Sequence, residues 1–207
     1  MKRARMGRTE SDEQLNRGAA GAQIAMPFVL DACCGPRMFW FNREDPRALF
    51  IDKRAGVYAR DLGTKKTKGR RPIVVAPDVL ADFTTMPFAD ESFYLVVFDP
   101  PHLTASRVGN HKNSIMANSY GVLSKTWPRE LEQGFTECFR VLKPGGTLVF
   151  KWAETCISVA AVLRAALPML PLFGNRSGKA THWYVFMKPA ERDSASAREI
   201  LPPSVKS

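Results

Sequence analysis

The four residues Asp99-Pro100-Pro101-His102 have the types and the order that could support chemistry on an amino group. They directly follow the apolar run Tyr94–Phe98, which predicts a buried strand with Asp99 at its carboxyl end. In open α/β sheets, ligands bind at that edge. Because proline has no N–H group, the segment offers a carboxylate and carbonyl oxygens but few donors. Acceptors beside a flat side chain suit an amino group on a flat ring, which favours methyl transfer onto nitrogen if a cofactor site lies upstream.

A second group of residues, nearer the N-terminus, has the spacing of a site for a nucleotide-like cofactor. The segment Asp31–Arg37 follows an apolar run, and its small side chains allow a ligand to approach the backbone closely. Asp52 ends the next apolar run, 21 residues after Asp31, which is the spacing of an acid that binds a ribose diol. Asp82 could accept a hydrogen bond from an adenine amine, with Phe83 against the ring. Asp52 could instead be a simple strand-end cap, but the order and spacing together favour a cofactor site.

The elements that must position these residues alternate between short strands and helices. Strands are expected at 28–30, 48–51, 73–75, 94–98, 147–152 and 181–187, and helices at 37–41, 131–142 and 158–167. Lys143-Pro144-Gly145-Gly146 is expected to end the second helix. This alternation predicts one α/β domain over residues 23–190, with a mainly parallel sheet and helices on both faces. Residues 1–22 are expected to form a flexible basic arm and residues 191–207 a flexible tail.

The composition bounds the class of protein. A chain of 207 residues with 45% apolar content can bury one α/β domain but not two sizeable ones. We expect no membrane span, no secretory signal and a reduced, cytoplasmic environment. The four cysteines have no disulfide or zinc spacing, and the adjacent Cys33 and Cys34 are expected to be small packing residues rather than nucleophiles. The histidines His102, His111 and His182 have no metal-ligand spacing, so no metal is expected.

The net charge of +10 is concentrated in one stretch of the chain. Between Lys53 and Arg71, eight basic residues stand against the single acid Asp61, so this stretch alone contributes 8 − 1 = +7. The basic residues are Lys53, Arg54, Arg60, Lys65, Lys66, Lys68, Arg70 and Arg71. Such a run could be a solvated loop or an edge that binds phosphates. Its position just after the second strand favours DNA or RNA as a partner.

In these motifs and their order, residues 24–188 resemble the class I S-adenosylmethionine-dependent methyltransferases. The resemblance implies a Rossmann-like domain with a seven-stranded sheet. It implies S-adenosylmethionine as the cofactor, S-adenosylhomocysteine as its product, and no metal. Asp31–Arg37 would hold the methionine moiety, Asp52 the ribose, and Asp82 with Phe83 the adenine. The expected cofactor-binding residues are Asp31, Ala32, Cys33, Cys34, Gly35, Arg37, Asp52, Lys53, Asp82, Phe83 and Asp99.

Two further segments are similar to features of the family, and a third segment, the glycine-rich turn, departs from the family pattern. Met86–Phe93 is similar to the family's Leu-Pro-Phe lead-in to the fourth strand, and Arg140–Gly146 to its turn before the fifth strand. We interpret the second of these as structural. The family's Gly-x-Gly-x-Gly turn is reduced here to Gly35, with Cys33 and Arg37 at the other two places.

The segment Asp99-Pro100-Pro101-His102 resembles the Asp-Pro-Pro-aromatic motif of amino-methyltransferases that act on adenine, cytosine or guanine, including small phage and prophage enzymes. The resemblance implies that the Asp99 carboxylate and the Pro100 carbonyl accept the N–H bonds of an exocyclic amine. This draws the lone pair out of the ring plane and stabilises the charge that develops on nitrogen. The fourth position is normally an aromatic residue that stacks on the base. His102 offers less area, which leaves room for another substrate.

Two polar segments are expected near the substrate. Leu103–Trp127 is predicted to be a substrate lid, and Phe173–Trp183 a second loop at the same face. Candidate substrate-binding residues in or near them are Arg107, His111, Lys112, Arg176 and Lys179. The sequence thus predicts an N-methyltransferase of nucleic acid, with adenine N6 favoured. The alternatives are a small-molecule or protein N-methyltransferase, and a cofactor-binding scaffold without activity.

Overall fold

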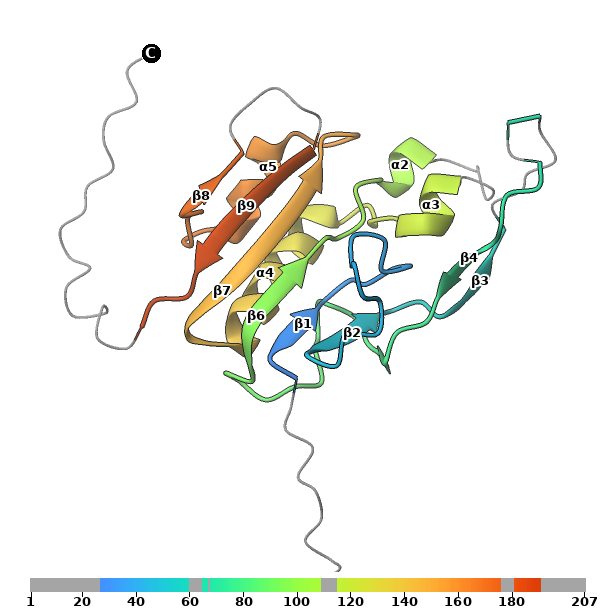
Figure 1. The fold of residues 1–207 in the computed structure, drawn as a ribbon. Coiled ribbons are helices and arrows are strands. Elements are labelled where there is room, and N and C mark those ends of the chain that lie inside the picture. The colour runs from blue at the N-terminus through green and yellow to red at the C-terminus, as the bar shows by residue number, and fades with distance from the viewer. Residues whose placement is uncertain (1–26, 60–64, 67, 109–114, 176–180, 191–207) are drawn as a thin grey trace, which may run out of the picture.

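The core of the molecule is one seven-stranded sheet (Figure 1). The computed structural model describes residues 27–59, 65–66, 68–108, 115–175 and 181–190, so the predicted arm and tail lie outside it. In their order across the sheet, the strands are β5 (Val79–Leu80), β2 (Ala48–Asp52), β1 (Val29–Asp31), β6 (Phe93–Phe98), β7 (Leu142–Ala153), β9 (Thr181–Met187) and β8 (Phe173–Gly174). The strands from β5 to β7 pair in parallel, whereas β9 runs antiparallel to β7 and β8. The predicted mainly parallel sheet of an α/β domain is confirmed.

Helix α4 (Trp127–Val141) packs against the centre of this sheet and fixes β6 in place. Its apolar side chains recur at helical spacing, and Leu131, Phe135 and Cys138 are buried. The ring of Phe135 lies 5.3 Å from that of Phe98 in β6, centroid to centroid. Gly134 lets the helix approach closely, since a Cβ atom there would lie 2.7 Å from the Phe98 ring. The strand that carries Asp99 at its end is therefore held rigidly from one side.

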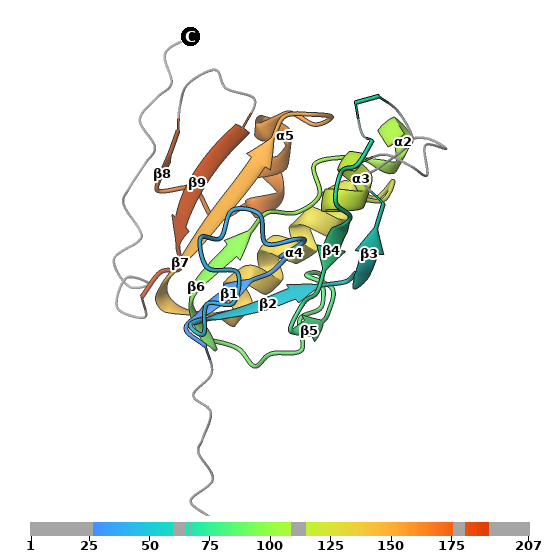
Figure 2. The same cartoon turned by 45° about the vertical axis from the view of Figure 1, so that its right-hand side comes forward.

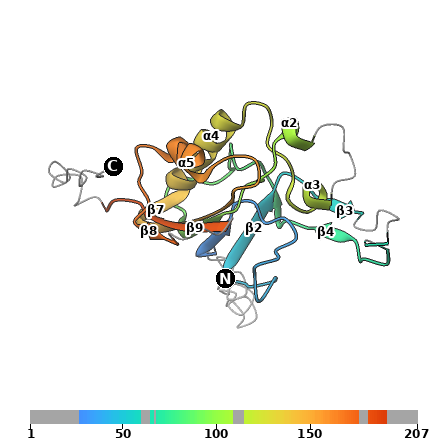
Figure 3. The ribbon, with the colours of Figure 1, turned by 90° about the horizontal axis from the view of Figure 1, so that it is seen from above.

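The two faces of the sheet are covered differently in the described residues. Helix α4, α5 (Val159–Leu163) and the 3-10 helix η1 (Arg164–Ala166) lie over one face (Figure 3). Near β1 and β2 the other face is crossed by residues 32–47 (Figure 2), which form turns and bends. The helix predicted at 37–41 is therefore wrong. Arg37 has a φ of 51°, which a helix cannot contain, and its side chain is bound to Asp78 instead.

Four elements outside the main sheet lie toward its carboxyl edge. Strands β3 (Gly56–Tyr58) and β4 (Ile73–Val75) form a separate antiparallel hairpin. The predicted strand at 73–75 is therefore confirmed, but it lies outside the main sheet. The predicted lid segment contains two short helices, α2 (Ala105–Val108) and α3 (Ile115–Tyr120), near that edge (Figure 1). None of the helices in the described ranges is long and apolar enough to cross a membrane.

Candidate active site

Four aspartates stand at the carboxyl ends of four neighbouring strands. Asp31 and Asp52 are the last residues of β1 and β2, Asp82 follows β5 by two positions, and Asp99 directly follows β6. Because the sheet order is β5-β2-β1-β6, these acids line one edge in the order Asp82, Asp52, Asp31, Asp99. Asp31, Asp52 and Asp99 were predicted to follow strands because each comes after an apolar run in the sequence.

Three of the four carboxylates close a turn on their own backbone. In each case Oδ1 accepts the N–H of the residue two positions later, which is an Asx-turn. The bonds are Cys33 to Asp31 (3.2 Å), Arg54 to Asp52 (2.9 Å) and Thr84 to Asp82 (3.0 Å). Asp99 cannot form this bond, because the residue two positions later is Pro101, which has no N–H. The Asp-Pro-Pro sequence thus leaves the Asp99 carboxylate without a donor from its own turn.

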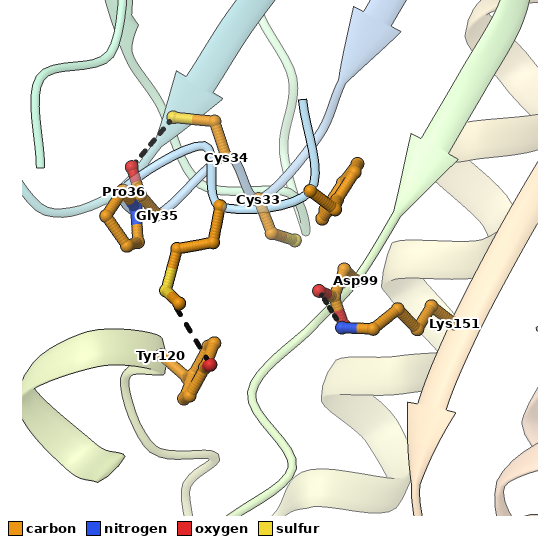
Figure 4. Close-up of a pocket in the computed structure, with 9 residues that line it drawn as sticks. Cys33, Cys34, Gly35, Pro36, Asp99, Tyr120 and Lys151 are labelled. Carbon is orange, nitrogen blue, oxygen red and sulfur yellow. Dashed lines mark hydrogen bonds and ion pairs between the residues drawn. The ribbon is translucent and has the colours of Figure 1, made fainter. Parts of the chain in front are cut away.

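Side chains from other parts of the chain hold Asp99 instead. Its Oδ2 accepts a 2.6 Å hydrogen bond from Nζ of Lys151 in the adjacent strand β7 (Figure 4). Its Oδ1 lies 2.9 Å from Nε2 of His102, but the angle is not that of a hydrogen bond. Within the described residues, Oδ1 therefore has no hydrogen-bond partner. The sequence analysis missed Lys151, although a lysine inside the buried run Thr147–Trp152 was a signal for it.

The imidazole of His102 points into the protein rather than into a cavity. It is buried and packs edge-to-face on Trp152, with ring centroids 4.9 Å apart and an interplanar angle of 74°. His102 lines neither of the cavities described next. In this structure the ring therefore contacts Trp152 rather than either cavity, and a catalytic role for His102 stays a prediction.

Two small cavities adjoin at the carboxyl edge of the sheet. The first has a volume of about 120 Å³ and is lined by the turn after β1, by Phe39, by Tyr120, and by Asp99 with Lys151 (Figure 4). The second, of about 20 Å³, is lined by residues that include Ala32, Asp52, Lys53, Phe83 and Pro101. Cys33 and Tyr120 line both cavities, so the two are separated by little more than these side chains.

The adjacent cysteines keep their protons. Burial raises the pKa of the Cys34 thiol to about 12 and that of Cys33 well above its usual value of 9. The neighbouring carboxylates Asp31 and Asp52 act in the same direction. A neutral thiol is a poor nucleophile, which supports the interpretation of both residues as packing residues.

Asp31 is the most deeply buried acid of the four. Burial raises its carboxyl pKa from 3.8 to about 7, although hydrogen bonds from Trp40 and Cys33 partly oppose this. The Trp40 indole donates to Oδ2 at 2.7 Å. A cationic group bound beside Asp31 would favour its ionised form. The turn after β1 is therefore an electrostatically suitable place for a positively charged ligand.

The Asp52 carboxylate is already bound by the side chain of Arg54. That side chain contacts both carboxylate oxygens, at 3.2 and 3.4 Å, and Oδ2 also accepts the N–H of Gly35 at 3.0 Å. The same guanidinium donates to the carbonyl of Asn118 in α3 at 3.2 Å. Both expectations for Asp52 are thus compatible with the structure, since it caps its own strand and also faces the second cavity.

Asp82 and Phe83 follow β5, and of the two only Phe83 lines the second cavity. Oδ2 of Asp82 lies 3.6 Å from Nζ of Lys53, and about a third of the Asp82 side chain is exposed. Phe83 is buried and packs edge-to-face on Phe98, 5.3 Å away between centroids. Its ring therefore belongs mainly to the core, and only part of it lines the cavity.

Some predicted site residues lie elsewhere. The Arg37 guanidinium stacks on Phe50 at 3.8 Å and donates to Asp78 at 2.7 Å, so its side chain clamps the turn instead of lining a cavity. Arg107 is exposed on α2 and lines neither cavity. Pro100 is buried beside Asp99. The candidates His111, Lys112, Arg176 and Lys179 lie outside the described residues.

The basic stretch surrounds the hairpin of β3 and β4. Its described residues beyond β3 are all exposed, namely Lys65, Lys66, Lys68, Arg70 and Arg71. Directly after β3, where the connecting loop of the hairpin begins, the carbonyl of Ala59 accepts a 2.9 Å hydrogen bond from the Asn118 side chain in α3. The basic hairpin and the helix that carries Tyr120 are therefore directly connected.

Comparisons with known proteins give only distant similarities. No protein-family model and no curated protein sequence matches the chain. Among solved structures, the PH0226 protein from Pyrococcus horikoshii OT3 has 17% identity and a TM-score of 0.46, over 77% of this chain and 81% of that one.

The N-methyltransferase NodS from Bradyrhizobium japonicum WM9, in complex with S-adenosylhomocysteine, has 17% identity and a TM-score of 0.45, over 87% and 86% of the two chains. A putative methylase, HI0767 from Haemophilus influenzae, has 14% identity and a TM-score of 0.41, over 86% of this chain and 96% of that one. These similarities are too distant to assign an activity, which has to come from the residues of the site.

Among the described residues, no cluster of three or more His, Cys, Asp or Glu side chains could hold a metal ion. The site contains a row of four strand-end carboxylates and two adjoining cavities, and one of the carboxylates, Asp99, forms no Asx-turn. These features lie at the carboxyl edge of an open, mainly parallel α/β sheet, where such folds bind their ligands.

Proposed function

We propose that this protein is an S-adenosylmethionine-dependent N-methyltransferase that acts on the exocyclic amino group of a nucleic-acid base, with adenine N6 as the favoured target. The observation that carries the proposal is the environment of Asp99. Its carboxylate has no donor in its own turn, borders the first cavity and lies beside the strand-end acids. Those features suit a group that must accept hydrogen bonds from an incoming amine.

The residues along the edge fit the cofactor. The turn at Cys33–Gly35 borders the first cavity, and the buried Asp31 that precedes this turn suits a ligand with a positive charge. Asp52 suits the hydroxyl donors of a ribose, and Asp82 suits the adenine amine. The fit requires Arg54 to release Asp52, because both oxygens of that carboxylate already accept N–H groups of the protein.

The chemistry assigned to the protein is the activation of a poor nucleophile. When bound, S-adenosylmethionine supplies a methyl group whose bond to sulfur breaks, with the electron pair left on sulfur, as the amine nitrogen forms its bond to carbon. Asp99 accepts an N–H bond of the amine and draws its lone pair out of ring conjugation. A carboxylate has about four acceptor sites, so Oδ2 can keep its bond to Lys151 while it does so. The same carboxylate is the nearest base for the proton that the amine loses.

Lys151 has a positioning role in this scheme. Its ammonium lies 2.6 Å from Oδ2, and its side chain is also 5.7 Å from the Phe39 ring and 5.8 Å from the Trp183 ring. The carboxylate is thereby held in one orientation before the substrate arrives. Such preorganisation is a major source of catalysis in buried polar sites.

The basic hairpin supports nucleic acid as the substrate. Its exposed lysines and arginines can contact phosphates, and it is joined through Asn118 to the helix beside the first cavity. A nucleic-acid strand bound along the hairpin would lie beside α3, the helix that carries Tyr120. A base inside a duplex would first have to leave the stack, so single-stranded DNA or RNA is the better first substrate to test.

The test uses the full chain with methyl-labelled S-adenosylmethionine and, in separate reactions, single-stranded DNA, duplex DNA, total RNA and a metabolite extract. The products are digested and each labelled nucleoside or metabolite is identified. We expect label on N6-methyladenine or another N-methylated base in one polymer. Label in the metabolite extract alone would replace the nucleic-acid substrate with a small molecule, and no label in any reaction would overturn the activity.

A charge-reversal variant tests the role of the hairpin within the same assay. Lys65, Lys66 and Lys68 are replaced by glutamate, and transfer is measured between 50 and 300 mM salt, a range in which phosphate contacts weaken steeply (roughly tenfold or more). We expect the KM for nucleic acid to rise and its salt dependence to flatten, with the Kd for the cofactor unchanged. An unchanged KM would mean that the hairpin is only a solvated loop.

A further inference from the structure

The substrate ring needs an aromatic partner that His102 does not provide. An unstacked base loses favourable contacts unless it stacks on a side chain. His102 is buried on Trp152 and lines neither cavity. The aromatic residues that do line the first cavity are Phe39 and Tyr120.

Phe39 is already engaged by other groups. Its ring stacks on Trp40, with centroids 6.1 Å apart and an interplanar angle of 28°, and it meets Trp183 edge-to-face at 6.0 Å. The ammonium of Lys151 lies 5.7 Å from its centroid. Each of these three contacts reduces the ring surface of Phe39 that is left for a base.

Tyr120 is in a different situation. It is partly exposed, lines both cavities, and among the described residues its ring has no aromatic or cationic partner. Its hydroxyl makes only a weak contact, 3.7 Å to the sulfur of Met38. In Figure 4 the ring lies across the first cavity from Asp99. Its face is therefore available to a ligand whose amino group reaches the Asp99 carboxylate.

The residue after Tyr120 explains how the ring comes to stand beside the Asp-Pro-Pro segment. Gly121 has a φ of 78° and ends α3, where its N–H donates to the Ala117 carbonyl at 2.8 Å. A Cβ atom at Gly121 would lie 3.2 Å from the Arg54 guanidinium and 3.4 Å from Pro101. The helix end thus packs tightly against the residue that precedes His102.

From these contacts we infer that Tyr120, supplied by the segment after the Asp-Pro-Pro motif, is the side chain that stacks on the ring of the methylated substrate. This inference rests on the proposed function and assigns to Tyr120 the task that the fourth motif residue was expected to perform. His102 becomes a positioning residue, because its imidazole stands 2.9 Å from Oδ1 of Asp99.

The experiment compares Tyr120→Ala, Tyr120→Phe and His102→Asn with the unmodified chain. Met116→Ala is the matched control, since Met116 is exposed on the same short helix. The probe is single-stranded DNA that contains 2-aminopurine, an adenine analogue whose fluorescence is quenched when it stacks. The KM and kcat for the methylated polymer and the Kd for the cofactor are measured in parallel, with circular dichroism as the check of folding.

We expect Tyr120→Ala to lose the quenching on binding and to raise the KM for nucleic acid about tenfold, the size of one lost stacking contact. Tyr120→Phe should restore both, because it keeps the ring and removes only the weak contact to Met38. His102→Asn should lower kcat and change its pH profile while leaving the KM and the quenching in place. Met116→Ala should leave all of these values unchanged.

The opposite pattern would overturn the inference: quenching and KM unaffected in Tyr120→Ala but lost in His102→Asn would return the stacking role to His102. This is distinguishable from failure of the proposed function, in which the unmodified chain neither binds nor methylates nucleic acid. If the labelled product is instead a small ring compound, the KM of the same four variants for that compound decides whether Tyr120 stacks on it.

Discussion

The aspartates at the sheet edge fall into two regions that differ in how the carboxylate is held. On the side of the proposed cofactor site, Oδ1 of Asp31, Asp52 and Asp82 in each case accepts the N–H of the residue two positions later. On the β6 side, Asp99 has no such donor and is held by Lys151, which is 52 residues away in the sequence. The first kind of carboxylate is fixed by local geometry, and the second depends on tertiary structure.

The difference gives a physical reason for the proline at position 101. A strand that ends in aspartate normally tends to close an Asx-turn, which costs the carboxylate one acceptor site. Pro101 removes the competing N–H, so the acceptor capacity of Asp99 remains for Lys151 and a substrate. The motif therefore acts through a donor that is missing from the backbone as well as through the rigidity of proline.

The largest effect is expected from Asp99→Asn. The amide keeps the size of the side chain but replaces an acceptor with a donor, so transfer should fall by about a thousandfold. The Kd for the cofactor should change by less than about threefold, since the three other acids remain. Single-turnover transfer and equilibrium binding measure the two quantities.

A matched control for this variant is Asp45→Asn. Asp45 lies outside the site and accepts the N–H of Arg47 at 3.0 Å in an Asx-turn. Transfer by the control should match that of the unmodified chain. Near-normal transfer by Asp99→Asn would remove Asp99 from the chemistry and with it the contrast between the two regions.

Pro101→Ala tests the comparison most directly, because it returns an N–H to the turn after β6. We expect the new donor to capture the Asp99 carboxylate, as Cys33 captures Asp31, and kcat to fall by about ten- to a hundredfold. The exposed Pro87 provides the control variant Pro87→Ala. A weaker cofactor Kd at unchanged kcat would show that Pro101 acts through the wall of the second cavity instead.

Asp31→Asn probes the cost of a buried acid on the cofactor side. Because burial raises the pKa of Asp31 to about 7 in the folded protein, the folded state retains a proton that the unfolded chain has already lost above pH 4. Its contribution to the free energy of unfolding therefore falls as pH rises from about 4 to about 7, and stays low above that. A rise of about three units in the pKa of Asp31 corresponds to at most roughly 4 kcal/mol.

We therefore expect Asp31→Asn to be more stable than the unmodified chain at pH 8, by about 1–3 kcal/mol, with the difference vanishing near pH 4. Urea unfolding at a series of pH values measures this difference in the free energy of unfolding. The contributions of the acids that both proteins share cancel when one curve is subtracted from the other. The same variant should bind the cofactor more weakly. A difference that does not vary with pH would mean that Asp31 is ionised throughout.

The smallest effect is expected from Arg54→Ala. Removing the guanidinium frees both Asp52 oxygens from its side chain and takes a positive charge away from the cofactor side. The Kd for the cofactor should fall about fivefold, which corresponds to roughly 1 kcal/mol for one partly exposed ion pair. Lys125→Ala, which removes an exposed charge, is the control. Weaker cofactor binding in Arg54→Ala would instead make Arg54 a contributor to the site.

The long helices and strands and the acids at strand ends could be predicted from the sequence, because both depend on the local pattern of residues. The buried runs at 48–51 and 94–98 and the periodic helix that contains Leu131 and Phe135 are strong signals. Strands β3, β5 and β8 have only two or three residues each, and their pairing is decided by tertiary contacts rather than by propensity. The helix expected at 37–41 failed because the clamp between Arg37 and Asp78 spans 41 residues.

The partners within the site were harder to predict for the same reason. Nothing local relates Lys151 to Asp99, or Tyr120 to the turn after β1, although all four positions line one cavity. His102 was placed in the site by its position in a motif, but the structure turns its ring toward Trp152. A motif thus fixed the backbone position of the residue, whereas packing fixed the direction of its side chain.

The contacts of Asn118 have a consequence for how two ligands would influence each other. The backbone carbonyl of Asn118 accepts a hydrogen bond from Arg54, its side chain donates one to Ala59 directly after β3, and Arg54 also binds Asp52. Arg54 and Asn118 thus connect Asp52 to the hairpin. If occupancy of Asp52 and occupancy of the hairpin both shift this small network, each ligand must change the affinity of the other by the same factor. The cooperativity between the two ligands would then depend on four residues rather than on the domain as a whole.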